Sequence, residues 1–100
     1  MTIPIGSKIL VIASLTPTCT AHYFIHAFRQ LGCAVKACSD VADSSANLRV
    51  SGAVNVSSLV AQLQFEPDIV LFIEGGTMQI LPIGLERVRC LTAWYGIDTH

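Results

Sequence analysis

Residues 8–13 read Lys8-Ile9-Leu10-Val11-Ile12-Ala13, a continuous apolar run that follows a single lysine. The run is too short for a typical helix, and it does not alternate between apolar and polar residues. A short apolar run without alternation is typical of a strand that is buried on both faces, as in a parallel sheet. This stretch therefore predicts a parallel α/β fold.

The residues after this strand predict a βαβ unit. A hydroxyl-rich loop over residues 14–20 leads into a helix from about Thr20 to Leu31, whose apolar residues recur at helical spacing. Gly32 is placed to end the helix, and residues 34–38 form the second strand. Parallel strands joined by a helix in this way have a right-handed connection in nearly all proteins.

The second half repeats the same types of element. Residues 39–52 are small and polar, which predicts a loop with one helical turn. A second helix with apolar residues at positions 56, 59, 60 and 63 follows, with Asn55 or Ser57 as its cap and Pro67 and Asp68 as its end. Residues 69–73 are a third buried strand.

The last part of the chain predicts a short helix and a strand. Pro82 to Val88 has proline in the first turn, which suits a helix start. Residues 90–95 predict a fourth strand. Together these elements predict one Rossmann-like domain over residues 1–100, with three layers and a mostly parallel sheet of four or five strands. Because a parallel strand is normally followed by a covering helix, we expect the natural protein to continue, or a partner to cover the sheet.

The composition agrees with a folded domain and argues against several functions. Of the 100 residues, 52% are hydrophobic and 13% are charged, so the chain must bury a core. The net charge is −1 with no basic run, which argues against nucleic-acid binding. The sequence contains no run of about 18 apolar residues, the length that a membrane-spanning helix needs, and no signal peptide is evident. We therefore expect a cytoplasmic protein. Uncovered apolar surface would favour self-association into a homo-oligomer.

The cysteines do not predict a metal or redox site. None of the four forms a C-x-x-C pair, which favours reduced and mostly buried thiols. His22 and His26 have the spacing of metal ligands on a helix, but no third ligand accompanies them, so we predict no metal site.

Polar residues cluster where parallel strands end, and ligands of open α/β sheets bind beyond those ends. We expect three loops to meet there. Their candidate substrate-binding residues are Thr18, Thr20, Glu74, Gly75, Gly76, Thr77, Thr99 and His100. The candidate catalytic residues are His22, in the first turn of the first helix, and Asp98, after the fourth strand. Simple structural roles compete with these: helix capping by Thr18 or Thr20, and a tight turn at Gly75 and Gly76. For His22 the alternative is an exposed histidine on the helix surface, and for Asp98 it is the cap of a following helix.

Four blocks of the chain occur in an order that resembles the amino-terminal half of the CgeB-like glycosyltransferases. The blocks are Lys8-Ile9-Leu10-Val11-Ile12, Ala27-Phe28-Arg29-Gln30-Leu31-Gly32-Cys33-Ala34-Val35, Pro67-Asp68-Ile69-Val70-Leu71-Phe72-Ile73-Glu74-Gly75-Gly76 and Thr92-Ala93-Trp94-Tyr95-Gly96-Ile97-Asp98-Thr99-His100. The first two blocks are shared by many Rossmann-like domains, and the last two are more specific.

The resemblance implies a two-domain GT-B fold in which this segment is the acceptor-binding domain. A missing carboxyl-terminal domain would hold the nucleotide-sugar donor, and these residues alone would not be catalytic. No bound cofactor or metal is implied, since the nucleotide-sugar is a substrate. By resemblance, Gly75, Gly76, Asp98 and His100 would line the acceptor side, and His22 would take the position of the base in some GT-B families. The expected partner is a sugar or glycan acceptor.

Two other functions fit parts of the sequence. Cys19, at a helix start after the first strand, has the position of a phosphorylated cysteine in a phosphotransferase IIB domain. However, five residues separate it from that strand. A flavodoxin-like or receiver-like interaction module is the other alternative, although the acidic pair of receivers is absent after Ala13 and Ser14.

Overall fold

The computed structural model describes residues 6–15, 20–41, 46–74, 80–83 and 90–96. Its helices and strands follow the order β1, α1, β2, β3, β4, α2, β5, β6, β7. Their bounds are β1 Lys8–Ala13, α1 Ala21–Gln30, β2 Ala34–Ser39, β3 Leu48–Arg49, β4 Gly52–Asn55, α2 Val56–Leu63, β5 Ile69–Glu74, β6 Ile80–Ile83 and β7 Leu91–Gly96. The four predicted strands are confirmed within about one residue at each end.

Five strands form one sheet in the order β3-β2-β1-β5-β7, and each described pair of neighbours is parallel. Counted along the chain within this sheet, the order is third, second, first, fourth, fifth. This is the order of Rossmann-like domains, whereas flavodoxin-like domains place their first strand between the second and third. The structure therefore confirms a Rossmann-like parallel sheet and argues against the flavodoxin-like and receiver-like alternative.

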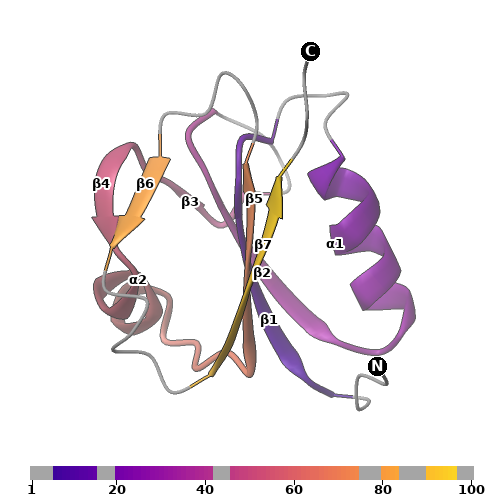
Figure 1. Ribbon diagram of the computed structural model, residues 1–100. Coiled ribbons are helices and arrows are strands. Elements are labelled where there is room, and N and C mark those ends of the chain that lie inside the picture. The colour runs from indigo at the N-terminus through magenta and orange to yellow at the C-terminus, as the bar shows by residue number, and fades with distance from the viewer. Residues whose placement is uncertain (1–5, 16–19, 42–45, 75–79, 84–89, 97–100) are drawn as a thin grey trace.

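The layers of the fold follow from the alternation of side chains along β1. Ile9, Val11 and Ala13 belong to the core cluster on the α1 side, whereas Leu10 and Ile12 belong to the cluster that holds the buried residues of α2. All five side chains are at most 1% exposed. Figure 1 shows the sheet edge-on, with α1 on one face and α2 on the other. The prediction that this strand is buried on both faces is confirmed.

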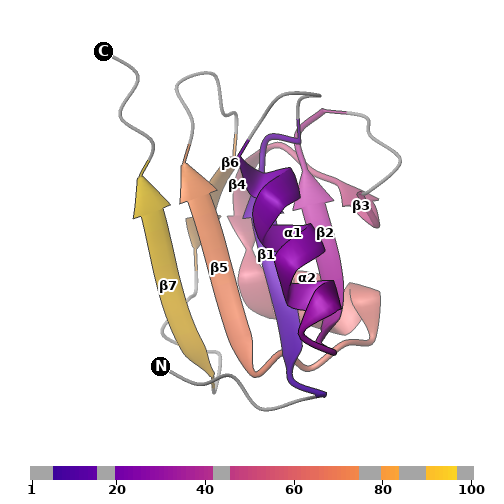
Figure 2. The ribbon, with the colours of Figure 1, turned by 90° about the vertical axis from the view of Figure 1, so that its right-hand side faces the viewer.

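The sheet is not covered evenly on its two faces. In Figure 2, α1 lies over β1 and β2, and no described helix lies over β5 and β7 on this face. Leu91 at the start of β7 is correspondingly 52% exposed, although Ala93 on the same face is partly buried. The α1 side of the edge strand therefore presents apolar surface.

The structure corrects two predictions of local structure. Ile80–Ile83 is strand β6, so the first two residues of the helix predicted over Pro82 to Val88 are in a strand, and the rest lie outside the described residues. β6 pairs in parallel with β4 in a separate two-stranded sheet. Part of residues 39–52, predicted as a loop, also forms strand structure, because Leu48 and Arg49 pair with the end of β2.

The end of α1 shows why Gly32 stops the helix. The N–H of Gly32 donates to the Arg29 carbonyl at 3.1 Å, and the N–H of Cys33 donates to the Phe28 carbonyl at 3.0 Å. This pair of bonds is the Schellman arrangement, which needs a left-handed residue between them. Gly32 supplies it with a φ of +86°. The prediction for Gly32 is therefore confirmed.

The second helix ends earlier than predicted. α2 stops at Leu63, because Gln64 turns into the left-handed region with a φ of 50°, three residues before Pro67. Among the described residues, neither helix is long and apolar enough to cross a bilayer.

Asn55 caps α2, which decides between the two predicted caps. Its Oδ1 accepts a hydrogen bond from the Ser58 N–H at 3.2 Å. We expect Asn55→Ala to lower the free energy of unfolding by about 0.5–2 kcal/mol, because a donor at the helix start loses its partner. Urea titration would measure the loss. Ser57→Ala is the matched control and should be close to neutral; an equal loss in both variants would contradict the cap.

Candidate functional site

The ends of three neighbouring strands define the candidate site. In the register of the sheet, Ala13 of β1 lies opposite Ile73 of β5, and Glu74 of β5 lies opposite Gly96 of β7. The segments that leave β1, β5 and β7 therefore start at one edge of the sheet. From β1 the chain continues to β2 and β3 on one side of the sheet, and from β5 it continues to β7 on the other side. The position between β1 and β5 is therefore the topological switch point, where open α/β sheets bind ligands.

The structure describes only some of the predicted site residues. Thr20, His22 and the backbone of Glu74 are described, and all three lie at this edge. The other predicted residues lie outside the described residues, namely Thr18, Gly75, Gly76, Thr77, Asp98, Thr99 and His100. The same holds for Cys19. The sheet brings the starting points of these segments together, and the roles of the individual residues stay predictions.

The helix start at Thr20 lacks the predicted cap. Thr20 is the N-cap residue of α1, but its side chain makes no capping hydrogen bond. Its backbone is helical, with φ −62° and ψ −26°, whereas a capping residue is usually extended. The first turn of α1 carries no acidic residue. Capping by Thr20 is therefore wrong, and the positive dipole end of α1 meets no carboxylate from its own first turn.

His22 lies in the first turn of α1, and the structure makes it half-buried. His26, one turn further along, is exposed. Because α1 begins at the carboxyl edge of the sheet, His22 is the closer of the two to the candidate site (Figure 1). The role of His22 as a general base stays a prediction.

The structure adds two residues that the sequence pattern did not reveal, Ser39 and Asp40 at the end of β2. Ser39 is fully buried, and its Oγ accepts hydrogen bonds from the N–H groups of Leu15 at 2.9 Å and Val41 at 3.1 Å. Asp40 is 8% exposed, which is rare for a carboxylate. Ser39 is the last residue of β2 and Asp40 follows it directly, and this change from apolar to polar residues at a strand end was the signal available in the sequence.

After Asp40 the chain returns to β2, and Asn47 and Arg49 form hydrogen bonds with residues near its end. The side chain of Asn47 accepts from the Ala37 N–H at 2.9 Å, and its own N–H donates to the Ala37 carbonyl at 2.8 Å. Arg49 Nε donates to the Asp40 carbonyl at 3.4 Å. These bonds hold the end of β2 between β1 and the returning segment, so the position of Ser39 is fixed from both sides.

Asp68, in one of the two more specific sequence blocks, has a structural role at the opposite edge. Its Oδ2 accepts from the Lys8 N–H at 2.8 Å, and its own N–H donates to the Lys8 carbonyl at 2.7 Å. Its carbonyl accepts from the Leu91 N–H at 3.2 Å. Asp68 therefore sets the starting register of β1, β5 and β7, and with it the alignment of their ends.

The described cysteines are structural rather than reactive. Cys33 and Cys38 are buried and Cys90 is half-buried, and all three are free thiols. Burial raises the pKa of the Cys38 thiol from 9.0 to about 11. Burial, and then the nearby Asp68 carboxylate, also raise the pKa of Cys90. A raised pKa keeps a thiol protonated and poorly nucleophilic at neutral pH.

The raised pKa of Cys38 predicts a loss of stability in alkaline solution. The unfolded thiol ionises near 9.0 and the folded thiol near 11, so its contribution is complete below pH 9.0 and is lost as the pH rises through 11. We expect the free energy of unfolding of the wild type to fall more steeply over this range than that of Cys38→Ala. Urea titrations at several pH values would measure both slopes, and parallel slopes would contradict the assignment.

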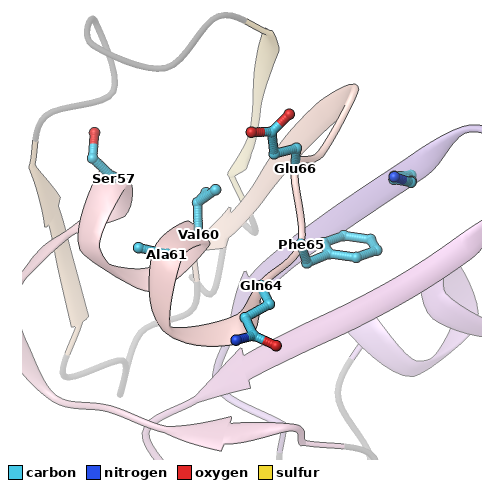
Figure 3. Close-up of a pocket in the computed structure, with 7 residues that line it drawn as sticks. Ser57, Val60, Ala61, Gln64, Phe65 and Glu66 are labelled. Atoms are coloured by element: carbon cyan, nitrogen blue, oxygen red, sulfur yellow. The ribbon is translucent and has the colours of Figure 1, made fainter.

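Two further features do not add to the site. Among the described residues, no group of three or more His, Cys, Asp or Glu side chains is placed to hold a metal ion. A groove of about 520 Å³ lies along α2 and the segment after it (Figure 3). Lys8, at the start of β1, lines it together with Glu66, which places the groove at the amino edge of the sheet. We place the site at the other edge, because ligands of parallel sheets bind at the carboxyl ends of strands.

Comparisons with known proteins do not identify the chain: no family model matches it, and neither a curated protein nor a solved structure does.

Proposed function

We propose that this chain is the acceptor-binding domain of a GT-B glycosyltransferase that transfers a sugar from a nucleotide-sugar donor. In this proposal the carboxyl edge over β1, β5 and β7 receives a sugar or glycan acceptor. A second Rossmann-like domain, which is not among these 100 residues, binds the donor. The segment alone is not catalytic.

One observation carries the proposal, the pairing of β5 with β7. Glu74 of β5 lies opposite Gly96 of β7, so these two strands end side by side. The two more specific blocks of the family resemblance contain most of these strands and the residues that follow them. Those following residues include Gly75 and Gly76 after β5, and Asp98 and His100 after β7. Carboxylate and hydroxyl side chains bind sugar hydroxyls, and glycines allow close approach of the backbone. An antiparallel β7 would have sent the two blocks to opposite edges.

The topology supports the same assignment. The strand order is that of a Rossmann-like domain, and GT-B enzymes are built from two such domains that face each other. The start of α1, which the Thr20 side chain does not cap, lies at the same edge as the two strand ends. A ligand bound there would lie at the positive end of the helix dipole, beside the polar side chains.

The test is a transfer assay on the natural full-length protein that carries these residues. UDP-glucose, UDP-galactose, UDP-N-acetylglucosamine and GDP-mannose are offered as donors, with p-nitrophenyl glycosides as acceptors, and product is detected by mass spectrometry. We expect transfer from at least one donor. Failure of the full-length protein to bind any of the four donors in calorimetry would contradict the proposal.

Variants separate the acceptor side from the donor side. Glu74→Gln should raise the KM for the acceptor while the Kd for the donor is unchanged. Glu66→Gln is the matched control, since Glu66 is exposed and lies at the amino edge of the sheet. An equal loss in the two variants would show that the carboxyl edge of β5 has no special role.

A further inference from the structure

The hydroxyl of Ser39 joins two segments at the carboxyl edge of the sheet that are 24 residues apart in sequence. It accepts from Leu15, the second residue after β1, and from Val41, the second residue after β2. Both lone pairs of the hydroxyl oxygen are therefore used by backbone donors. Its own backbone carbonyl accepts from the Val50 N–H at 2.8 Å, so the residue is held on the β3 side as well.

This hydroxyl connects β2 to the chain just beyond the end of β1. β1 and β2 are in register as far as Ile12 and Cys38. Beyond these residues the bond from Leu15 to Ser39 continues the contact with a side chain in place of the backbone. Leu15 is 1% exposed and belongs to the α1-side core, so both ends of the connection are fixed.

We propose that Ser39 is a positioning residue of the acceptor site. By holding Leu15 beyond the end of β1, its hydroxyl fixes the point from which the chain continues to Thr20 and His22. This inference rests on the proposed function, because it assigns Ser39 to the same site. Ser39 is fully buried and does not itself touch a substrate.

The physical reason for a functional effect is the precision that catalysis needs. A bound acceptor must be held within a fraction of an ångström of its productive position, and a small displacement lowers the rate strongly. Without the Ser39 hydroxyl, the N–H groups of Leu15 and Val41 lose their acceptor. They must then hydrogen-bond to water or to another group. We expect Leu15 and Val41 to shift, while β1 and β2 keep their own backbone hydrogen bonds.

Three variants of the full-length protein test the inference. Ser39→Ala removes the acceptor, and Ser39→Cys keeps the volume but accepts hydrogen bonds weakly, which preserves the test if Ser39→Ala does not fold. Cys38→Ala is the matched control: it alters the adjacent buried residue, whose side chain faces the α2-side core. Amide hydrogen exchange reports on the loop. We expect the Leu15 and Val41 amides to lose protection in the Ser39 variants and to keep it in Cys38→Ala.

Kinetics with the donor and p-nitrophenyl glycoside that the wild type uses provide the second measurement. We expect kcat/KM for the acceptor to fall about tenfold in the Ser39 variants, with the Kd for the nucleotide-sugar unchanged. Cys38→Ala should keep the wild-type value at a temperature where all variants are folded. If the amides lose protection but kcat/KM is unchanged, Ser39 is structural only and this inference is overturned. If the wild type itself transfers no sugar, the proposed function fails instead, and this inference fails with it.

Discussion

Replacing Ile12 with alanine is expected to lower the free energy of unfolding by about 2–5 kcal/mol, the usual cost of an Ile→Ala change in a core. Ile12 is 0% exposed and lies between Cys38 of β2 and Phe72 of β5 in the middle of the sheet. Neighbours on both sides restrict collapse of the cavity. A domain of this size has a total stability of roughly 5–15 kcal/mol, so the loss is a large fraction of it. Urea titration followed by circular dichroism measures the change.

Leu91→Ala provides the contrast within the same sheet. Leu91 is 52% exposed on edge strand β7, so its truncation should cost no more than about 1 kcal/mol. The difference between the two variants tests the central position of β1. Equal losses would mean that β1 is not the middle of the core.

The sheet could be predicted because its signals are local. After Lys8 the residues of β1 are all apolar, and β5 is apolar as far as Glu74; this pattern is diagnostic before any partner is known. Gly32 has a local signal too, since a glycine after the last apolar position of a helix favours a left-handed stop. Strands joined through a helix, such as those over residues 8–13 and 34–38, are then expected to pair in parallel by the ordinary rules of connection.

The missed features depend on partners far along the chain. Proline at position 82 suggests a helix start, but β6 forms because Gly52–Asn55 lies beside it, about thirty residues earlier in sequence. Pro82 has no N–H to donate, which a strand at the edge of a two-stranded sheet tolerates. Ser39 was part of a stretch that resembles an ordinary polar loop, and its role depends on Leu15, which no local pattern connects to it.

The candidate site was predicted as a location rather than as a set of contacts. The rule for parallel sheets selected the carboxyl edge, and the register of β5 with β7 shows that these two strands end side by side there. The rule does not distinguish a residue that binds a ligand from one that caps a helix. Thr20 shows this limit: capping by Thr18 or Thr20 was predicted, and the structure excludes it for Thr20.

For the proposed glycosyltransferase with His22 as its base, His22→Gln is expected to lower the transfer rate of the full-length protein by roughly 10²- to 10⁴-fold, the usual contribution of a general base. The glutamine keeps a polar side chain of similar length but cannot accept the proton that leaves the acceptor hydroxyl. His22 is half-buried in the first turn of α1, at the edge where β1, β5 and β7 end. Initial rates with the donor and acceptor that the wild type uses give kcat, and calorimetry gives the Kd for the donor, which should not change.

His26→Gln distinguishes a base from a histidine that merely lies on the helix surface. His26 is on the same helix, one turn away from the edge, and is exposed. Its substitution should leave kcat within about twofold of the wild type, since surface changes away from a site have small effects. Asp98→Asn provides the competing assignment. A near wild-type rate in His22→Gln together with a loss of 10²-fold or more in Asp98→Asn would assign the base to Asp98. The carboxylate after β7, rather than the first turn of α1, would then receive the acceptor proton.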